Sequence, residues 1–331
     1  MSPLVSVVLP VRNGGEYLRE AVDSILSQSF ENLELLLIDD HSTDDAVSSL
    51  DQSDLRLKIL KTNGNGVVDA FNSGLEQCRG EYVARMDADD ISLPGRIRSQ
   101  LEYLETHSSV DICGCCVDIF SDTGIQGGLA RYQNWLNSVR EPGQVRQQIF
   151  IESPLPNPGV MFCSAAIKQL GGYRNCQWPE DYDLLLRADA AGMRMGKPDP
   201  VLLRWREHES RLTHTDSLYE RKNFMRAKSH FIVHHRLQGR SVIIWGAGPT
   251  GRLMHDLLCS EGANIEGFIE VHPRRIGGLK RGLPVWPIDK VKSQGDAMVL
   301  VAVGAAGARK EIADYMQKHN KLPERDYLFV A

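Results

Sequence analysis

Two aspartates, Asp87 and Asp89, follow an expected strand and are separated by a single alanine. Carboxylates at this spacing, placed at the end of a strand, can direct their oxygens at one hard cation. Mg²⁺ and Mn²⁺ prefer oxygen ligands, and they commonly bind one or two carboxylates together with substrate phosphates. Such a cation would offset negative charge on a phosphate leaving group. Asp87, Asp89 and the adjacent Asp90 are also compatible with a turn or a helix cap, where Asp is common. Asp90 fits that interpretation best.

Further acids stand at two other places where chemistry is expected. Asp40 follows the expected strand 33–38, where a carboxylate can accept hydrogen bonds from a base or a ribose. Asp181 lies in the first turn of an expected helix, whose dipole and free N–H groups keep an acid ionised. An ionised carboxylate there could remove a proton from a hydroxyl group. A capped loop and ordinary helix-start chemistry are the alternatives for these two acids.

A histidine and a glycine-rich turn complete the set of candidate residues. His208 follows the expected strand 201–206 and could bind a metal or a diphosphate, although a lone histidine is more often structural. The turn matches Gly-x-Gly-x-x-Gly between a strand and a helix, and an acid ends the next strand. This context predicts a second nucleotide site, with NAD(P) as one ligand, at Gly246, Gly248, Gly251 and Glu270. No hydride-transfer residues accompany it, so a Rossmann-like module that binds another nucleotide, or none, and mediates assembly is the alternative.

The periodicity of apolar residues predicts how these groups are positioned. Strands are expected at 4–10, 33–38, 56–60 and 81–86, with helices at 16–28 and 66–78 and after Pro94. Alternating strands and helices indicate a parallel α/β sheet, which binds ligands at the carboxyl ends of its strands. The polar clusters around Arg12, Asp40 and Asp87 all follow such ends. Ser42 or Thr43 is expected to cap a helix after the second strand.

The rest of the chain is divided by the same reasoning. A loop with a short helix is expected at 121–145, strands at 157–163 and 201–206, and helices at 179–192 and 216–236. The strand–turn–helix pattern then starts again near 237–240. We therefore predict two domains, residues 1–237, including the helical segment 216–236, and residues 238–331.

Composition narrows the class of protein. The chain has 331 residues and a formal net charge of −5, which excludes the general basic footprint of a nucleic-acid-binding protein. Its seven cysteines are an odd number without a CxxC pair, which favours reduced thiols in a cytoplasmic protein. No signal peptide or run of about 18–20 apolar residues is evident, so any membrane contact is expected to be peripheral.

Three stretches, in this order and spacing, resemble the family-two glycosyltransferases of the GT-A fold. They are VSVVLPVRNGGEYLREAVDSILSQSFENLELLLIDDHSTD, NGNGVVDAFNSGLEQCRGEYVARMDADDISLPGRI and GGYRNCQWPEDYDLLLRADAAG, within residues 4–206, roughly 60% of the chain. The resemblance implies a GT-A-type, mostly parallel sheet flanked by helices. It also implies a metal-dependent, inverting, hexosyltransferase-like enzyme. The segment after residue 237 is not part of the family core and looks like the Rossmann-like α/β modules appended to some sugar-modifying enzymes.

The resemblance also assigns roles to individual residues. Asp40 matches the base-contacting carboxylate, beside Pro10, Arg12 and Asn13. Asp87 and Asp89 match the Asp-x-Asp pair that contacts the donor and the metal, with Asp89 as the direct ligand. Asp181 matches the catalytic base, and His208 matches the Arg-x-His that many members carry. The turn Asp-Asp-His-Ser departs from the family's common Asp-Asp-Gly-Ser, and little consequence is expected.

Together these features predict a donor, a cofactor and an acceptor. The donor is expected to be a nucleotide-diphospho-sugar, by family habit a UDP-sugar, with Mg²⁺ or Mn²⁺ as the cofactor. The acceptor is expected to be a hydroxyl of a glycan or of a lipid-linked sugar, in polysaccharide or glycan biosynthesis. Two rival hypotheses are an NAD(P)-dependent sugar-modifying enzyme that uses the C-terminal domain and a non-catalytic sugar-nucleotide-binding protein.

Overall fold

The structure is a computed structural model that describes residues 2–122 and 124–331. The chain divides into two compact units, and each is considered by itself. The first comprises Met1–Arg146 and Pro154–Ser217, and the second comprises Gln147–Ser153 and Leu218–Ala331. No helix within the described residues is long and apolar enough to cross a membrane.

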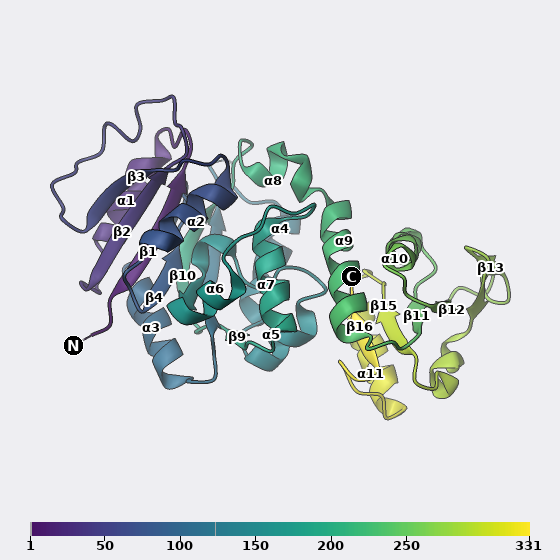
Figure 1. Ribbon diagram of the computed structural model, residues 1–331. Coiled ribbons are helices and arrows are strands. Elements are labelled where there is room, and N and C mark those ends of the chain that lie inside the picture. The colour runs from purple at the N-terminus through teal and green to yellow at the C-terminus, as the bar shows by residue number, and fades with distance from the viewer. Residues whose placement is uncertain (1, 123) are drawn as a thin grey trace. The chain divides into compact units, whose positions relative to one another are not determined.

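A seven-stranded sheet forms the centre of the first unit, in the order β3-β2-β1-β4-β8-β6-β9. Figure 1 shows its strands β1 to β4 with helices beside them. The bounds are β1 Val5–Val11, β2 Leu33–Asp39, β3 Leu57–Lys61, β4 Tyr82–Arg85, β6 Ile112–Cys113, β8 Met161–Cys163 and β9 Met195–Gly196. The strands from β3 to β4 are parallel, whereas β8 runs antiparallel to its neighbours β4 and β6. Every residue of β1 and β2 is buried, as the continuous apolar runs predict for a sheet covered on both faces.

Helices flank this sheet and pack their apolar faces against it. In α1, for example, the buried residues Leu18, Ala21, Val22 and Ile25 recur at helical spacing. The helices of this unit are α1 Tyr17–Leu26, α2 Val67–Gln77, α3 Arg96–Thr106, α4 Gly127–Ser138, α6 Ser164–Leu170, α7 Glu180–Ala190 and α8 Leu212–Thr215, with a 3₁₀ turn at Asn157–Gly159. Helix α5, Pro142–Gln148, crosses the division between the two units. The mostly parallel α/β architecture that the sequence predicts is therefore present.

A smaller three-stranded sheet lies in the same unit, in the order β5-β10-β7. It comprises β5 Ile91–Ser92, β7 Cys116–Phe120 and β10 Val201–Arg206. Leu203 of β10 pairs with Ser92 of β5, so the segment just after Asp90 is joined to the strand that leads to His208. This pairing brings residues more than a hundred positions apart to one edge of the unit.

The second unit contains a six-stranded sheet, in the order β13-β14-β12-β11-β15-β16. Its strands are β11 Val242–Trp245, β12 Ile265–Ile269, β13 Leu279–Lys280, β14 Leu283–Trp286, β15 Met298–Val301 and β16 Tyr327–Phe329. Its helices are α9 Arg221–Phe231, which continues as a π-helix at Ile232–Arg236, α10 Pro249–Ser260 and α11 Ala308–Lys318, with 3₁₀ turns at Ser217–Tyr219 and Ile288–Ser293. The buried Lys228 of α9 donates from Nζ to the carbonyl of Ile151 at 2.7 Å, which ties the short segment Gln147–Ser153 to this unit.

Several local expectations differ from the structure. Residues 44–50 form turns instead of a helix, because Ser42 and Thr43 contact Asn13 and leave no cap. Pro94 precedes α3 by two residues, with Gly95 at the N-cap. Helix α4 fills much of the expected loop at 121–145, and the expected helix 216–236 is divided into a 3₁₀ turn, α9 and a π-helix.

The sequence pattern places the helical segment 216–236 in the first domain, but most of it belongs to the second unit. Helix α9 packs against α10 and falls in the second unit, about twenty residues before the expected boundary at 237. A new strand marks where the periodicity changes, but tertiary contacts decide where a helix that precedes the strand is buried.

Candidate active site at the carboxyl edge of the large sheet

The expected donor-side residues follow β1 and β2 at the same edge of the sheet. Val11 of β1 pairs with Asp39 of β2, so the segments that leave both strands emerge side by side. Pro10 is buried within β1 and pairs with Ile38. The backbone N–H of Asp40 donates to the carbonyl of Val11 at 2.8 Å, which holds the two strand ends together. Residues that the sequence places about thirty positions apart therefore share one site.

Asp40 is buried at this edge with one carboxylate oxygen engaged and the other unpaired. Its Oδ2 accepts a hydrogen bond from the N–H of Gly66 at 2.9 Å and lies 3.7 Å from Nη1 of Arg12. Nη1 of Arg12 also donates to Asn65 at 2.8 Å. Oδ1 of Asp40 is fully buried without a partner, although buried carboxylate oxygens are normally hydrogen-bonded. The geometry suits an N–H donor from a ligand such as a nucleotide base.

Asn13 organises the loop that borders Asp40. Its N–H donates to Ser42 at 3.0 Å, and its amide oxygen accepts from the N–H of Thr43 at 2.7 Å. Asn13 and His41 have φ values of 55° and 57°, in the left-handed region that favours glycine. The ring of His41 lies 2.9 Å from the carbonyl of Gly64 through Nε2. The departure from Asp-Asp-Gly-Ser is thus accommodated by a histidine that adopts a glycine-like backbone and contacts a neighbouring loop.

Three carboxylates crowd together where β4 ends. Oxygens of Asp87, Asp89 and Asp90 all lie within 4.8 Å of one another. Burial raises the pKa of Asp87, and repulsion from Asp89 adds to that shift, although Arg85 opposes it. Burial and the charges of Asp89 and Asp87 raise the pKa of Asp90 well above its ordinary value. Carboxyl groups that are held this close favour either protons or a cation among them.

Buried arginines lie beneath the three acids. Nη2 of Arg85 is 2.6 Å from Oδ1 of Asp87, and Nη1 of Arg85 donates to the carbonyl of Met86 at 2.6 Å. Arg96 is fully buried and donates to the carbonyl of Arg85 at 2.6 Å. The guanidinium groups therefore compensate part of the negative charge and fix the direction in which the strand end leaves the sheet.

Asp90 and Asp89 are connected to the strand that precedes His208. Oδ1 of Asp90 accepts a hydrogen bond from the N–H of Arg206 at 2.8 Å, while its Oδ2 is buried without a partner. Nε of Arg206 donates to the carbonyl of Asp89 at 2.8 Å. Nε2 of His208 lies 2.8 Å from Oδ2 of Asp89, and its Nδ1 lies 2.8 Å from the Ser210 hydroxyl. The structure thus brings His208 to the acid that the sequence predicts as its co-ligand.

Asp181 lies in the first turn of helix α7, and its charge acts on Tyr173 together with charges at the end of β4. Burial raises the pKa of Tyr173, and the negative charges of Glu180, Asp181 and Asp87 add to this shift while Arg85 opposes it. Charges at the end of β4 and in the first turn of α7 therefore both act on Tyr173. Oδ1 of Asp181 accepts a hydrogen bond from the N–H of Tyr182 at 2.6 Å, as expected for an acid in a first helical turn.

Side chains within and before α7 fix its first turn. Asp183 accepts hydrogen bonds from Nε1 of Trp178 at 2.9 Å and from Nε of Arg187 at 2.6 Å. Arg187 also donates to the carbonyls of Leu170 and Gly172, at 2.5 and 2.8 Å. These contacts hold the helix and the turn before Tyr173 in one arrangement. The ring N–H of Trp178 is thereby engaged with Asp183.

The residues present fit a hard divalent cation. The acid cluster supplies oxygens only, which Mg²⁺ and Mn²⁺ prefer, and His208 adds a nitrogen beside Asp89. The unpaired Oδ2 of Asp90 and the raised pKa values of Asp87 and Asp90 both indicate negative charge that lacks full compensation from the protein. Asp87, Asp89 and His208 would hold the ion, with Asp90 close to it.

Two of the three positions in the glycine-rich turn of the second unit require a glycine. A Cβ on Gly251 would lie 1.8 Å from the carbonyl oxygen of Gly246, and Gly246 itself has a φ of 115°. Gly248 has open space around it, at the N-cap of α10. The acid Glu270 is engaged by its own turn, since it accepts from the N–H of Val271 at 2.9 Å and from Nη1 of Arg275 at 2.9 Å.

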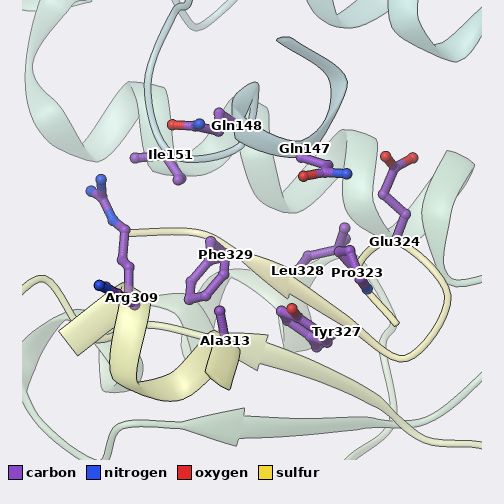
Figure 2. A pocket seen from close by; sticks show the side chains of 11 residues that line it. Gln147, Gln148, Ile151, Arg309, Ala313, Pro323, Glu324, Tyr327, Leu328 and Phe329 are labelled. Atoms are coloured by element: carbon purple, nitrogen blue, oxygen red, sulfur yellow. The ribbon is translucent and has the colours of Figure 1, made fainter. Parts of the chain in front are cut away.

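The second unit also has a pocket of about 250 Å³, which Figure 2 shows from close by. Arg309 and the aromatic rings of Tyr327 and Phe329 contribute to its lining, together with Gln147, Gln148, Ile151, Lys310, Ala313, Pro323, Glu324 and Leu328. No residue of the predicted nucleotide site contributes to it.

Sequence reasoning missed three contributors to the site. Arg85 is a lone cation in the buried strand Tyr-Val-Ala-Arg, and that unusual placement was the signal that could have identified it. The sequence favours a turn role for Asp90, yet its carboxylate is buried and one of its oxygens has no partner. Tyr173 carried no local signal, because its importance comes from neighbours that lie far away in the sequence.

Comparison with known proteins is consistent with this geometry. The family model "Glycosyl transferase family 2" matches residues 6–170. The Bacillus subtilis protein EpsE, named as a glycosyltransferase, is 35% identical over 62% of this chain and 73% of its own length. An uncharacterized glycosyltransferase of Haemophilus influenzae is 30% identical over 68% of this chain and 71% of its own length.

Solved structures share the fold. S. aureus TarS, in complex with UDP-GlcNAc, has a TM-score of 0.57 at 19% identity and covers 78% of this chain and 71% of its own. The mannosyltransferase PcManGT from Pyrobaculum calidifontis, in complex with GDP-Man and Mn²⁺, has a TM-score of 0.50 at 17% identity and covers 98% of this chain and 83% of its own. With the matched motifs, the acid cluster and relatives that align over most of their length, the chain belongs to glycosyl transferase family 2.

Proposed function

We propose that this glycosyltransferase moves a sugar from a nucleotide-diphospho-sugar to a hydroxyl acceptor with inversion at the anomeric carbon, in polysaccharide or glycan biosynthesis. The main support for this proposal is a group of buried polar atoms that have no hydrogen-bond partner. Among the described residues, four buried side-chain nitrogen or oxygen atoms have no hydrogen-bond partner, and three of them belong to Asp40, Arg85 and Asp90. Buried polar atoms are rarely left unpaired, so their concentration along one sheet edge supports a polar, charged ligand there.

In this proposal the donor lies along the carboxyl edge of the sheet. Oδ1 of Asp40 accepts a hydrogen bond from the base, with Pro10, Arg12 and Asn13 around it. The structural relatives TarS and PcManGT were solved with UDP-GlcNAc and GDP-Man, which supports a nucleotide-sugar donor. A UDP-sugar is the first donor to test, because the family resemblance implies uridine and TarS was solved with UDP-GlcNAc.

The proposed cofactor is Mg²⁺ or Mn²⁺, held by Asp87, Asp89 and His208. When bound, the cation offsets the negative charge that the diphosphate gains as the sugar bond breaks. The protein's own part is to keep the acids in place: Arg85 holds Asp87, and the backbone of Arg206 holds Asp90. A bound cation would allow these acids to be ionised next to a phosphate, which carboxylates alone would repel.

Asp181 is proposed as the catalytic base. The start of helix α7 favours its ionised form, and Trp178, Asp183 and Arg187 hold that helix in position. The acceptor hydroxyl loses its proton to Asp181 as its oxygen bonds to the anomeric carbon, while the bond to the diphosphate breaks on the opposite face. A single displacement of this kind inverts the configuration.

The second unit is proposed to be a Rossmann-like accessory domain. Its parallel strands and glycine-rich turn support that description, and the open space at Gly248 would admit a ligand near the start of α10. The engagement of Glu270 by Arg275 leaves less of that carboxylate for a ribose. An NAD(P)-dependent activity is therefore not favoured over glycosyl transfer.

The decisive experiment compares Asp181→Asn with the native protein in a transfer assay that contains Mn²⁺. Loss of a general base is expected to lower kcat by about 10²–10⁴-fold. Donor binding, measured by calorimetry, should stay within about twofold, because Asp181 is not assigned to the base or to the diphosphate. Asp199→Asn is the matched control, since that side chain is 84% exposed and pairs with Arg140. Full turnover by Asp181→Asn would refute the assigned role.

A further inference from the structure

A second group of metal-ligating side chains lies in the second unit. His230 lies in the last turn of α9, and His234 follows in the π-helix. Glu261 is the C-cap residue of α10. Nδ1 of His230 and Nε2 of His234 each lie 3.0 Å from the same oxygen, Oε2 of Glu261. One potential ligand atom from each residue lies within 4.8 Å of the other two.

We propose that His230, His234 and Glu261 form a Zn²⁺ site that joins α9 to α10, independent of the proposed sugar transfer. Imidazole nitrogens and a carboxylate oxygen are common ligands of zinc, which binds them at about 2.0–2.2 Å. Ligand atoms of a tetrahedral zinc ion are then about 3.3 Å apart. The two His–Glu separations are close to this value, so the side chains would move apart only slightly to admit the ion.

The backbone supports this convergence from both helices. His230 and His234 are four residues apart in a continuous helical segment, which places them on one side of it, about one turn apart. Their ring centroids are 4.5 Å apart. The π-type hydrogen bond from the N–H of Leu237 to the carbonyl of Ile232 widens this turn, and such turns are frequent at functional sites. The N–H of Glu261 donates to the last turn of α10, which fixes its backbone.

The chemistry of this group separates it from the acid cluster of the first unit. Two nitrogens and one oxygen suit Zn²⁺, whereas Mg²⁺ prefers oxygen ligands alone. The side chains of His230, His234 and Glu261 are 35%, 47% and 27% exposed, so solvent reaches the group and water can supply a fourth ligand. A site of this kind would clamp two helices of the second unit and stabilise it.

The test is a titration of the tag-free full-length protein, stripped with chelator and kept in excess Mg²⁺ to occupy the oxygen-rich site. We expect one equivalent of Co²⁺ to give the intense visible absorption of a tetrahedral site, and Zn²⁺ to displace it. His234→Ala and Glu261→Gln should weaken zinc binding by at least about 100-fold, more than the loss of a supporting contact outside the ligands. Zinc should raise the Tm of the native protein but not that of either variant.

His235→Ala is the matched control, because His235 is the next residue in the π-helix and stacks on Phe231, and the three grouped ligand residues are His230, His234 and Glu261. It should bind zinc like the native protein. Equal zinc affinity in the native protein and His234→Ala, or no cobalt spectrum in the native protein, would overturn the proposal. A site that survives Glu261→Gln but not His234→Ala would also overturn it, since the three-ligand geometry would then be wrong.

Discussion

Arg85 holds Asp87 from below the sheet edge, with Nη2 of the arginine 2.6 Å from Oδ1 of the aspartate. The arginine side chain is only 4% exposed, whereas that of the aspartate is 26% exposed. The pair therefore connects a buried cation to the surface at which a donor diphosphate is expected to bind. Breaking such a pair leaves an uncompensated charge, which costs more than the pair itself contributes.

Arg85→Met should destabilise the protein by about 3–5 kcal/mol when no divalent cation is present, because Asp87, Asp89 and Asp90 would repel one another without the guanidinium. Added Mn²⁺ should restore part of that loss, since the ion supplies positive charge to the same acids. Urea unfolding with and without MnCl₂ measures both effects. Arg140→Met, which removes a half-exposed partner of Asp199, should cost less than about 1 kcal/mol and should not respond to Mn²⁺. Equal losses in the two variants would contradict the prediction.

Asp40→Asn should weaken nucleotide-sugar binding by about 10–100-fold, the effect of losing one hydrogen bond to a charged acceptor. The substitution keeps the size of the side chain, so the contact with Gly66 can persist in altered form. Calorimetric Kd values for a UDP-sugar and a GDP-sugar in Mn²⁺ test this. Asp45→Asn, at an exposed position of the neighbouring loop, serves as the control. An unchanged Kd in Asp40→Asn would place the base elsewhere.

Glu34 should make stability depend on pH below 4.5. Burial by itself would raise the pKa of Glu34, but hydrogen bonds from Arg79, Lys58 and Ser6 outweigh it and lower the pKa to about 2. The folded state therefore holds this proton less tightly than the unfolded state does. Its contribution, at most about 3 kcal/mol, is present above pH 4.5 and is lost as the pH falls toward 2.

Glu34→Gln tests this dependence. The variant should be less stable than the native protein at pH 7, and the difference should shrink as the pH falls from 4.5 toward 2. Urea unfolding at a series of pH values gives the two curves. Parallel curves over that range would show that another acid controls the acid limb.

Gly251→Ala and Gly248→Ala should differ sharply in stability although they lie in the same turn. The Cβ at 251 would meet the backbone oxygen of Gly246 at 1.8 Å, and we expect a cost of about 3 kcal/mol or more, because backbone cannot yield like a flexible side chain. The Cβ at 248 meets nothing within 4 Å, and a change within about 0.5 kcal/mol is expected. Thermal unfolding of the two full-length variants measures this difference. Equal Tm values would show that the turn can accommodate a Cβ at position 251.

Most elements of the first unit could be predicted because their signals are local. The apolar runs of β1 and β2 and the helical spacing of Leu18, Val22 and Ile25 indicate burial directly. One expectation that differs does so because a distant residue intervenes. Asn13 engages Ser42 and Thr43, so residues 44–50 form turns in place of the expected helix.

The candidate site likewise has features that local sequence predicts and features that depend on tertiary contacts. The sequence by itself determined that Asp40, Asp87 and Asp181 stand at strand or helix ends, since residue type and periodicity are readable over a few positions. Only the tertiary structure decided that His208 meets Asp89, 119 residues away, that Arg85 compensates the acids from beneath, and that His230, His234 and Glu261 converge. Such meetings depend on how sheets and helices pack, and no short stretch of sequence carries that information.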